Sequence, residues 1–287
     1  MIEVKNLKFS YGKKQLFDNL NLSAKSGNIY GLLGKNGAGK TTLLSLLAGL
    51  LRPSGGDISI MDYVPRRRSP NFLNKVIYVP EKFYTPSITV KTYEEIYKVF
   101  YPDFDSVYFN NCLDEFGIEI DKRINTLSYG QQKKFLLAFA FASMCPLVLM
   151  DEPTNGLDIP SKKQFRKILV NAATEERLFI ISTHQVRDLE NLIDPIIILD
   201  EGKIIFNHTL EEVESYLAVY HSRDRKMAES SLYYEKSLKG YSVVMERNNE
   251  FGDEGRIELE SLFNLVIENT EKVQSLFARK ESENENK

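Results

Sequence analysis

The residues with the clearest chemical meaning form one short glycine-rich segment, GKNGAGKT, at positions 34–41. Glycines at this spacing let successive backbone N–H groups turn toward one anion, as in a phosphate-binding loop. An apolar run that predicts a strand precedes the segment and a leucine-rich run that predicts a helix follows it, which is the context this loop requires. Lys40 is expected to reach the β- and γ-phosphates of a nucleotide, and Thr41 is expected to ligate Mg²⁺. The predicted phosphate-binding residues are Gly34, Lys35, Asn36, Gly37, Ala38, Gly39, Lys40, Thr41 and Thr42.

Two neighbouring carboxylates, Asp151 and Glu152, follow an apolar run at 147–150 that predicts a buried strand. Ligands of parallel sheets bind at the carboxyl ends of the strands, so both side chains are expected near the phosphate loop. Asp151 is predicted to hold Mg²⁺ through its water shell, and Glu152 to accept a proton from an attacking water or to polarise it. An acidic pair after a strand is often only a solvated helix cap, and its combination with the phosphate loop favours the catalytic interpretation.

Four more sequence motifs accompany the phosphate-binding loop and the acidic pair, and their order along the chain is part of the pattern. Residues 127–132, LSYGQQ, resemble the LSGGQ signature of the ATP-binding cassette (ABC) ATPases, and residues 155–158, NGLD, resemble the D-loop of that family. His184 follows an apolar run and resembles the switch histidine of the family, while Tyr11 resembles its adenine-stacking aromatic residue. The resemblance covers residues 1–210, about three quarters of the chain.

This resemblance implies a role for each element. Tyr11 is expected to stack on adenine, where an aromatic face is worth about 0.5–1.5 kcal/mol. Ser128 and the N–H groups beside it are expected to cap a γ-phosphate held by the opposite subunit, and an ordinary serine N-cap uses the same geometry. His184 is expected to donate a hydrogen bond to the γ-phosphate or to orient the attacking water, and Lys40, Glu152 and His184 form the predicted catalytic set. The other predicted nucleotide contacts are Ser128, Tyr129, Gly130, Gln131 and Asp158.

The chain departs from the family pattern at two of these positions. Glu81 stands where the family commonly has glutamine, and its carboxylate is expected to bind Mg²⁺ or water while adding a negative charge near the phosphates. Tyr129 replaces the usual glycine of the signature. This replacement keeps the backbone N–H group that is expected to contact the phosphate. His208 and His221 have no comparable context and are predicted to be surface residues.

Apolar runs alternate with helical patterns, which predicts an α/β fold with a phosphate-loop core, a parallel sheet and an antiparallel N-terminal β part. The predicted ATPase domain spans 1–210, with a mostly helical insert at about 89–143, and a small α+β appendage spans 211–287. Strands are expected at 2–9, 16–24, 28–33, 76–79, 147–150, 178–182, 196–199, 232–238 and 241–245. Helices are expected at 41–51, 90–100, 104–116, 130–142, 160–172, 185–192, 211–220 and 257–267, and the polar residues 280–287 are expected to be disordered.

Bulk composition excludes several classes of protein. The formal net charge of -3 provides no strong attraction for nucleic acid, and Arg66, Arg67 and Arg68 are interpreted as a solvated loop without interleaved aromatic residues. No run of about 20 apolar residues predicts a membrane span, and the start of the chain lacks the apolar stretch of a secretory signal. Cys112 and Cys145 lack metal-ligand spacing and are expected to be reduced core thiols.

The resemblance therefore implies an ATP- and Mg²⁺-dependent ATPase subunit at the cytoplasmic face of a membrane. Its expected partners are an integral membrane permease and a second ATP-binding subunit, identical or different, arranged head to tail, and no nucleic acid is expected. Glu81 and the appendage favour export, while the sequence does not identify the cargo because the permease would choose it. Soluble ABC ATPases acting in cluster assembly, translation or DNA maintenance remain the alternative.

Overall fold

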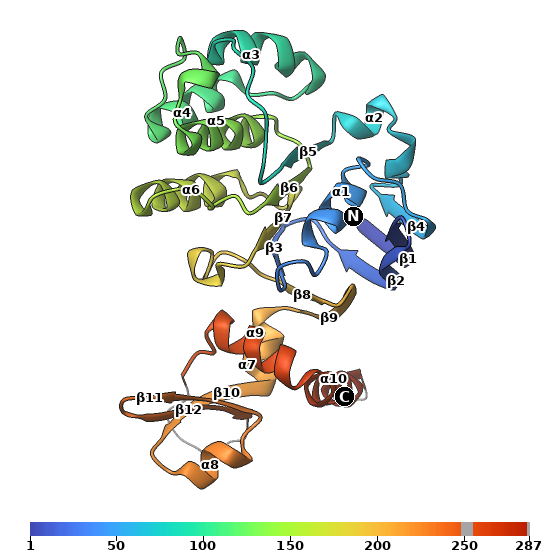
Figure 1. The fold of residues 1–287 in the computed structure, drawn as a ribbon, viewed down its shortest axis with the longest axis vertical. Helices are drawn as coiled ribbons and strands as arrows, with labels where there is room; N and C mark the ends of the chain where they lie inside the picture. The colour runs from blue at the N-terminus through green and yellow to red at the C-terminus, as the bar shows by residue number, and fades with distance from the viewer. Residues whose placement is uncertain (248–254, 286–287) are drawn as a thin grey trace.

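The computed structural model describes residues 1–247 and 255–285. Figure 1 shows an elongated arrangement, with a helical layer at one end, a central sheet, and the C-terminal elements at the other end. In those described residues, no helix has both the length and the apolar character needed to cross a bilayer. Cys112 and Cys145 are both buried free thiols, as expected.

The central sheet has six strands in the order β5-β6-β7-β3-β8-β9. The first five strands run parallel to their neighbours, and β9 runs antiparallel to β8. The five parallel strands are nearly continuous buried apolar runs, as in a sheet that is covered on both faces. Since parallel strands all end at one edge, the segments after β3, β6 and β7 emerge side by side. The strands are β3 (Asn28–Leu33), β5 (Val76–Val79), β6 (Leu147–Asp151), β7 (Leu178–Thr183), β8 (Ile196–Asp200) and β9 (Lys203–His208).

A separate antiparallel sheet, β2-β1-β4, lies beside the central one (Figure 1). Strands β1 (Ile2–Tyr11) and β2 (Lys14–Ala24) alternate buried and exposed residues, as expected for a sheet with one packed face. Their presence confirms the predicted antiparallel N-terminal part. The third strand, β4 (Gly55–Ile60), was not predicted, because its glycine pair indicates a turn rather than the start of a strand.

Helices fill the predicted insert between β5 and β6. Thr89 and Asp105 begin the first two by accepting hydrogen bonds from backbone N–H groups, and Gly117 ends the second with a left-handed φ of 67°. Phe109, Phe135 and Phe139 pack there as one aromatic cluster. The helices are α3 (Val90–Tyr97), α4 (Ser106–Phe116) and α5 (Tyr129–Ala142), while α1 (Lys40–Leu47) and α6 (Ile159–Ala172) follow β3 and β6.

The C-terminal part combines a three-stranded sheet, β10-β12-β11, with four helices. Its apolar side chains join those of the central sheet in one core: Phe277 lies 5.2 Å from Phe206 of β9, ring centre to ring centre. The predicted strands at 232–238 and 241–245 and the helix at 257–267 are present. The elements are α7 (Leu210–Tyr216), β10 (Leu217–Ser222), α8 (Arg225–Ser230), β11 (Tyr233–Ser237), β12 (Gly240–Glu246), α9 (Leu259–Glu268) and α10 (Thr270–Glu285).

Three sequence predictions were wrong. The helix predicted at 211–220 ends at Tyr216, because the next residues pair with β12 and bury the apolar side chains of β10. The helix predicted at 185–192 is one 3₁₀ turn, η4 (Val186–Asp188), since Asp188 and Leu189 donate to carbonyls three residues back. Residues 280–285 are helical rather than disordered, because α10 is anchored by buried Phe277 and by an Arg279–Glu246 ion pair of 2.6 Å. Residues 286 and 287 lie outside the described part of the chain.

Candidate active site

A cavity of about 550 Å³ opens where β3 and β6 end, beside the first turn of α1. It gathers most of the predicted phosphate-loop residues together with both predicted acids and the predicted switch histidine. Lys14 and Leu16 of β2 also line it, and no sequence motif had pointed to them. The predicted residues in its wall are Tyr11, Lys35, Asn36, Gly37, Gly39, Lys40, Thr41, Thr42, Glu81, Asp151, Glu152 and His184.

Backbone geometry explains the glycines of the phosphate loop. A Cβ atom on Gly34 would lie 2.3 Å from the carbonyl oxygen of Leu199, so no side chain fits between β3 and β8 there. Gly37 has a φ of 83°, which is a left-handed conformation that favours glycine. Ala38, within the loop, is buried and does not line the cavity. The loop thus turns sharply and leads directly into the N-terminus of α1.

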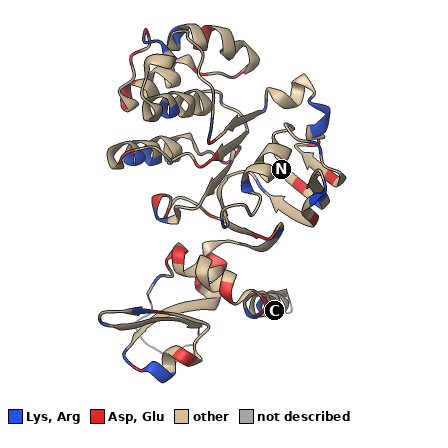
Figure 2. Ribbon diagram, in the orientation of Figure 1, with Lys and Arg blue, Asp and Glu red and all other residues tan. Residues whose placement is uncertain are grey.

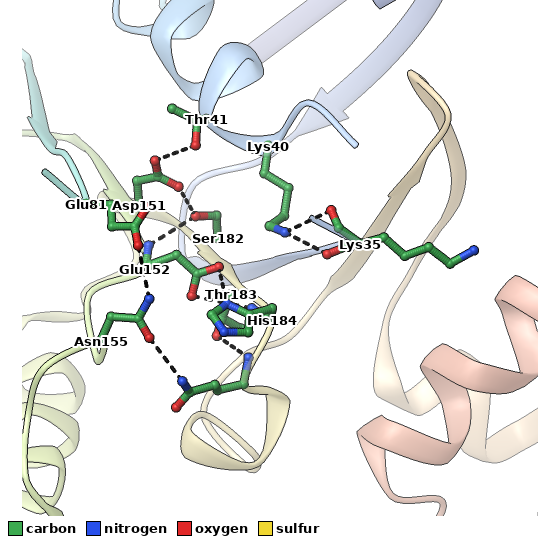
Figure 3. Close-up of polar contacts among 12 residues, drawn as sticks. Lys35, Lys40, Thr41, Glu81, Asp151, Glu152, Asn155, Ser182, Thr183 and His184 are labelled. Carbon is green, nitrogen blue, oxygen red and sulfur yellow. Dashed lines mark hydrogen bonds and ion pairs between the residues drawn. The ribbon is translucent and has the colours of Figure 1, made fainter. Parts of the chain in front are cut away.

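Lys40 is the first residue of α1 and is almost fully buried. Its Nζ atom donates to the carbonyl oxygens of Gly34 and Lys35, at 2.6 Å and 3.4 Å (Figure 3). Burial lowers the pKa of Lys40, while the nearby carboxylates of Glu152 and Asp151 act in the opposite direction. The ammonium group is therefore held within the loop that precedes its own helix.

Asp151 receives hydrogen bonds from two hydroxyl groups. The Oγ1 atom of Thr41 donates to Oδ2 at 2.6 Å, and Ser182 donates to Oδ1 (Figure 3). Ser182 lies on β7, the strand next to β6, so pairing of these strands brings its hydroxyl to Asp151. The sequence reasoning missed Ser182, although its place near the end of an apolar strand beside the acidic strand was a usable signal.

Glu152 and His184 contact each other directly. Nδ1 of His184 lies 2.7 Å from Oε1 of Glu152, and the backbone N–H of His184 donates to Oε2 at 3.4 Å. Glu152 has a left-handed φ of 47°, an uncommon conformation for a residue with a side chain. Its N–H group donates to the Ser182 carbonyl at 3.1 Å, which holds this conformation in place. Figure 3 shows the two side chains pointing toward each other from the ends of β6 and β7.

Glu81 joins the site through a chain of amide contacts. Its Oε1 atom accepts a hydrogen bond from Nδ2 of Asn155 at 3.2 Å. The side-chain Oδ1 atom of Asn155 in turn accepts a hydrogen bond from Nε2 of Gln185 at 3.1 Å. Gln185 directly follows His184, so the chain links the segment after β5 to the segment after β7. Asn155 belongs to the predicted D-loop, but only Asp158 of that segment had been predicted to contact nucleotide.

Tyr11 stands at the cavity mouth, with about half of its surface exposed. Its ring packs edge-on against Phe9 with centroids 4.9 Å apart, and its hydroxyl lies 3.2 Å from Oγ1 of Thr42. Because about half of the side chain is exposed, a flat ligand can reach the ring, as stacking requires.

The LSYGQ segment and Asp158 do not line this cavity. Ser128 caps α5: its hydroxyl accepts from the N–H of Gln131, whose side chain accepts from the N–H of Ser128 in a capping box. Tyr129 and Gly130 are the next residues, at the solvent-facing end of the helix. Asp158 caps α6, and the hydrogen bonds from Ser161 lower the pKa of its carboxyl.

A second cavity, of about 650 Å³, lies on the far side of His184 and reaches the C-terminal part. Lys35 and Val186 line one wall, and Glu260 and Phe263 of α9 line the other. Arg187 and Glu260 form an ion pair of 2.7 Å across it. The segment after His184 is therefore in direct contact with α9.

Comparison with known proteins agrees with this geometry. The family model described as "ABC transporter" matches residues 17–155. The chain is 30% identical to the bacitracin transport ATP-binding protein BcrA of Bacillus licheniformis, over 76% of this chain and 74% of the relative. It is 32% identical to the uncharacterized ABC transporter ATP-binding protein MJ1023 of Methanocaldococcus jannaschii, over 91% of this chain and 97% of that protein.

The fold is also similar to a solved dimeric ATP-binding cassette bound to ADP and Pi, with a TM-score of 0.63 and 24% identity. That match covers 73% of this chain and 98% of the solved chain. The chain belongs to the family of ABC transporter ATP-binding proteins, and it is an ATP-binding and ATP-hydrolysing member of that family. The predicted resemblance and α/β fold class are thereby confirmed.

Proposed function

We propose that this chain is the peripheral motor of a membrane transporter whose membrane-spanning permease is a separate protein. The observation that carries the proposal is the convergence of the phosphate loop, Asp151, Glu152 and His184 in one cavity. They come from three segments, and parallel strand order brings the ends of β3, β6 and β7 together. Such convergence supports hydrolysis of a nucleoside triphosphate rather than simple anion binding.

Mg²⁺ fits the oxygen atoms at one end of the cavity. The Thr41 hydroxyl and the Asp151 carboxylate lie 2.6 Å apart, and hard oxygen donors of this kind suit the ion. Glu81 would add a third oxygen group from the cavity wall. Within the described residues, no group of three or more His, Cys, Asp or Glu side chains is arranged for a metal, so substrate phosphates would supply further ligands. When bound, the ion neutralises charge on the β- and γ-phosphates.

The chain's own groups act on the remaining parts of the reaction. Lys40 and the loop N–H groups hold the β- and γ-phosphates, and Tyr11 stacks on the base. Glu152 accepts a proton from the water that attacks the γ-phosphorus, while the bond from that phosphorus to the β-phosphate oxygen breaks and ADP leaves. His184, held by Glu152 through Nδ1, keeps Nε2 directed toward the γ-phosphate and the water.

A second ATP-binding subunit completes the site in this proposal. Ser128, Tyr129, Gly130 and Gln131 lie outside the cavity of their own chain, at the N-terminus of α5. Such a helix end attracts anions, so it suits a γ-phosphate held by another subunit. Two subunits arranged head to tail by two-fold symmetry bury two ATP molecules, and hydrolysis removes the phosphate that bridges them. Gly156 lies against the Tyr129 ring, so we place Asp158 of the same D-loop at this boundary too.

An apolar groove of about 640 Å³ supports docking of a permease. It lies between the helical insert and the part of the chain that follows α1, and it contains exposed apolar side chains. Val99 is 71% exposed and Phe100 is 60% exposed, although both are apolar. Apolar surface of this kind marks protein contact sites. The groove residues are Ala48, Leu50, Arg68, Pro70, Leu73, Asn74, Val76, Tyr78, Tyr97, Val99, Phe100, Tyr101 and Pro102.

Docking on a permease locates this chain at the cytoplasmic face of the membrane as a peripheral subunit. Export is the direction we favour, because Glu81 replaces the usual glutamine and the chain carries the C-terminal appendage. Residues 1–210 act as the ATPase domain, with the insert at about 89–143, and residues 211–287 act as the appendage. Nucleic acid is not an expected partner, since Lys and Arg positions are spread over many elements (Figure 2).

The test is to tag the chain in its native host, solubilise membranes in mild detergent and identify the proteins that co-purify. A polytopic membrane protein is the expected partner. Val99→Asp should abolish its recovery, whereas Val107→Asp, on α4 outside the groove, should not; both valines are 71% exposed. Recovery of the wild-type chain only with ribosomal, DNA-maintenance or cluster-assembly proteins would overturn the transporter proposal and leave the ATPase assignment intact.

A further inference from the structure

Lys133 of α5 is a fully buried lysine that no motif explains. Its side chain is 0% exposed, although lysine is almost never fully buried without a partner. The Nζ atom lies 3.5 Å from the backbone carbonyl oxygen of Glu81 and 5.8 Å from the centre of the Phe83 ring. Its contact with Glu81 is therefore to the backbone and not to the carboxylate.

Tyr129, one turn earlier on the same helix, contacts the same two residues. Its hydroxyl donates to the Glu81 carbonyl at 2.9 Å, and its ring stacks on Phe83 with centroids 5.4 Å apart and planes 13° apart. Residues four apart on a helix lie on one face, so Tyr129 and Lys133 reach the segment together. The Glu81 carbonyl thus accepts from two donors of α5.

The charges around Lys133 differ from those around Lys40, the other buried ammonium of this region. Burial lowers the pKa of Lys133 to about 8, and among the carboxylates that oppose this shift Glu81 has the largest effect. For Lys40 the largest opposing effect comes from Glu152, and Glu81 comes last. Among the nearby carboxylates, Glu81 is therefore the one that most favours the charged form of Lys133.

We propose that Lys133 is a positioning residue: with Tyr129 it clamps the Glu81 segment onto α5, and its ammonium supplies the counter-charge that a glutamate at position 81 requires. The inference rests on the proposed function, because it assigns the regulation of the same ATP site. It also accounts for the departure from the family pattern, since Glu81, Asp151 and Glu152 would otherwise add three negative charges to one cavity wall. Movement of α5 then carries Glu81 with it.

A double-mutant cycle between Glu81 and Lys133 tests the counter-charge. The variants are Glu81→Gln, Lys133→Met and both together, and their urea unfolding midpoints are measured without nucleotide or divalent cation. Lys133→Met should lower the midpoint clearly when Glu81 is present and much less when glutamine replaces it. Lys134→Met is the matched control, because the neighbouring ammonium lies over the Phe116 ring instead. Its effect should be the same in both backgrounds.

The same variants are then assayed for ATP hydrolysis. Lys133→Met should lower kcat roughly tenfold with Glu81 present and roughly twofold in the Glu81→Gln background, while KM for ATP changes less than about threefold in either background. Lys133→Gln keeps a donor for the Glu81 carbonyl but removes the charge, so it should resemble Lys133→Met if charge is what matters. Equal losses in both backgrounds would overturn the counter-charge, because a purely structural lysine gives additive effects.

The clamp itself is tested with fluorescence, since the chain contains no tryptophan. In a Phe83→Trp background, Tyr129→Phe and Lys133→Met should each shift the indole emission to longer wavelength as the segment leaves α5. Unchanged emission in both variants would contradict the clamp. If the wild-type chain fails to hydrolyse ATP at all, the proposed function fails, whereas the unfolding cycle and the fluorescence still decide the clamp.

Discussion

His184 is bound to Glu152 at two points: its ring Nδ1 lies 2.7 Å from Oε1, and its backbone N–H donates to Oε2 at 3.4 Å. An ionised carboxylate can only accept, so the tautomer with the proton on Nδ1 is the one that fits this contact, and it leaves Nε2 as the second ring nitrogen for the cavity. The orientation of the predicted switch residue is therefore set by the predicted base, and neither can be altered without affecting the other.

Replacing Glu152 with glutamine should therefore stop turnover while leaving ATP binding intact. The amide cannot accept the proton of water, and loss of a general base costs on the order of 10²–10⁴ in rate. His184→Ala in addition should cost little more, because residues that act as a unit are not additive. Phosphate release and binding of a fluorescent ATP analogue provide the two measurements. His221→Ala, an exposed histidine of β10, should change neither, and normal turnover by Glu152→Gln would refute the assigned role.

Removing the Ser182 hydroxyl should weaken both the fold and the catalysis. Ser182 is fully buried, and its hydroxyl donates to Asp151 and accepts from the N–H of Glu152 at 3.2 Å. Ser182→Ala leaves Oδ1 of Asp151 without this donor, which costs about 1–3 kcal/mol in free energy of unfolding, while the Glu152 N–H keeps its bond to the carbonyl of residue 182. Urea unfolding gives this loss, and a Mg²⁺ titration of ATPase activity should require more ion than wild type. An unchanged Mg²⁺ requirement would show that the Ser182 hydroxyl does not support ion binding by Asp151.

Tyr11 should contribute to nucleotide affinity through its ring and not through its hydroxyl. Tyr11→Ala removes the stacking face, which is worth about 0.5–1.5 kcal/mol or roughly 2- to 13-fold in Kd for ATP. Tyr11→Phe removes only the 3.2 Å contact with Thr42 and should leave Kd nearly unchanged. Equilibrium titration with a fluorescent ATP analogue measures both. A Tyr11→Phe variant as weak as Tyr11→Ala would show that the hydroxyl carries the effect.

Two glycines of the phosphate loop should respond differently to alanine. Gly34→Ala places a Cβ atom 2.3 Å from a backbone oxygen of β8, so the sheet must move, and we expect a loss of about 3 kcal/mol or more. Gly37→Ala meets no atom within 4 Å and bears only the strain of its left-handed φ, roughly 1–2 kcal/mol. Thermal and urea unfolding rank the two variants. The reverse order would contradict the close approach of β3 and β8.

Buried thiols should make the chain less stable in alkali. Burial raises the pKa of Cys112 to about 11 and that of Cys145 to about 12, above the ordinary value of 9.0. Above pH 9 the unfolded chain releases thiol protons that the folded chain retains. The free energy of unfolding is therefore unaffected by the thiols below pH 9, and above it falls by up to about 1.4 kcal/mol per pH unit for each thiol.

Urea unfolding under reducing conditions at pH 8, 9 and 10 measures this loss, and the tyrosines and Lys133, which also titrate in this interval, are present in both proteins compared. The Cys112→Ser, Cys145→Ser double variant should lose less stability over that interval, because serine does not titrate there. Equal slopes for the two proteins would exclude the thiols as the cause.

The sequence was sufficient wherever residues near one another in the chain determine the outcome. The glycine-rich turn before α1, the strand that ends at Asp151 and the helices between β5 and β6 follow from local patterns, and the structure contains these elements. Residues that act through distant neighbours were missed: Ser182 reaches Asp151 only because β6 and β7 pair, and Lys133 reaches Glu81 only because α5 packs beside the segment after β5. No periodicity within either segment reports such a contact.

Two of the three wrong element predictions have the same origin. The apolar content of Leu217–Ser222 is compatible with a helix or a strand. The segment is a strand because it pairs with β12. Residues 280–285 are polar enough to suggest disorder, but α10 is anchored by Phe277 within the shared core. Tertiary packing overrode local composition in both cases.

That shared core has a consequence for the lifetime of the protein. Ile198 and Phe206 of the central sheet and Leu262 and Phe277 of the C-terminal helices belong to one apolar cluster, so the two parts are expected to melt together. Nucleotide bound near β3 then protects α10 from proteases, and a cut that releases α10 exposes the motor to degradation. Survival of the catalytic machinery is thereby made dependent on the integrity of the last helix in the chain.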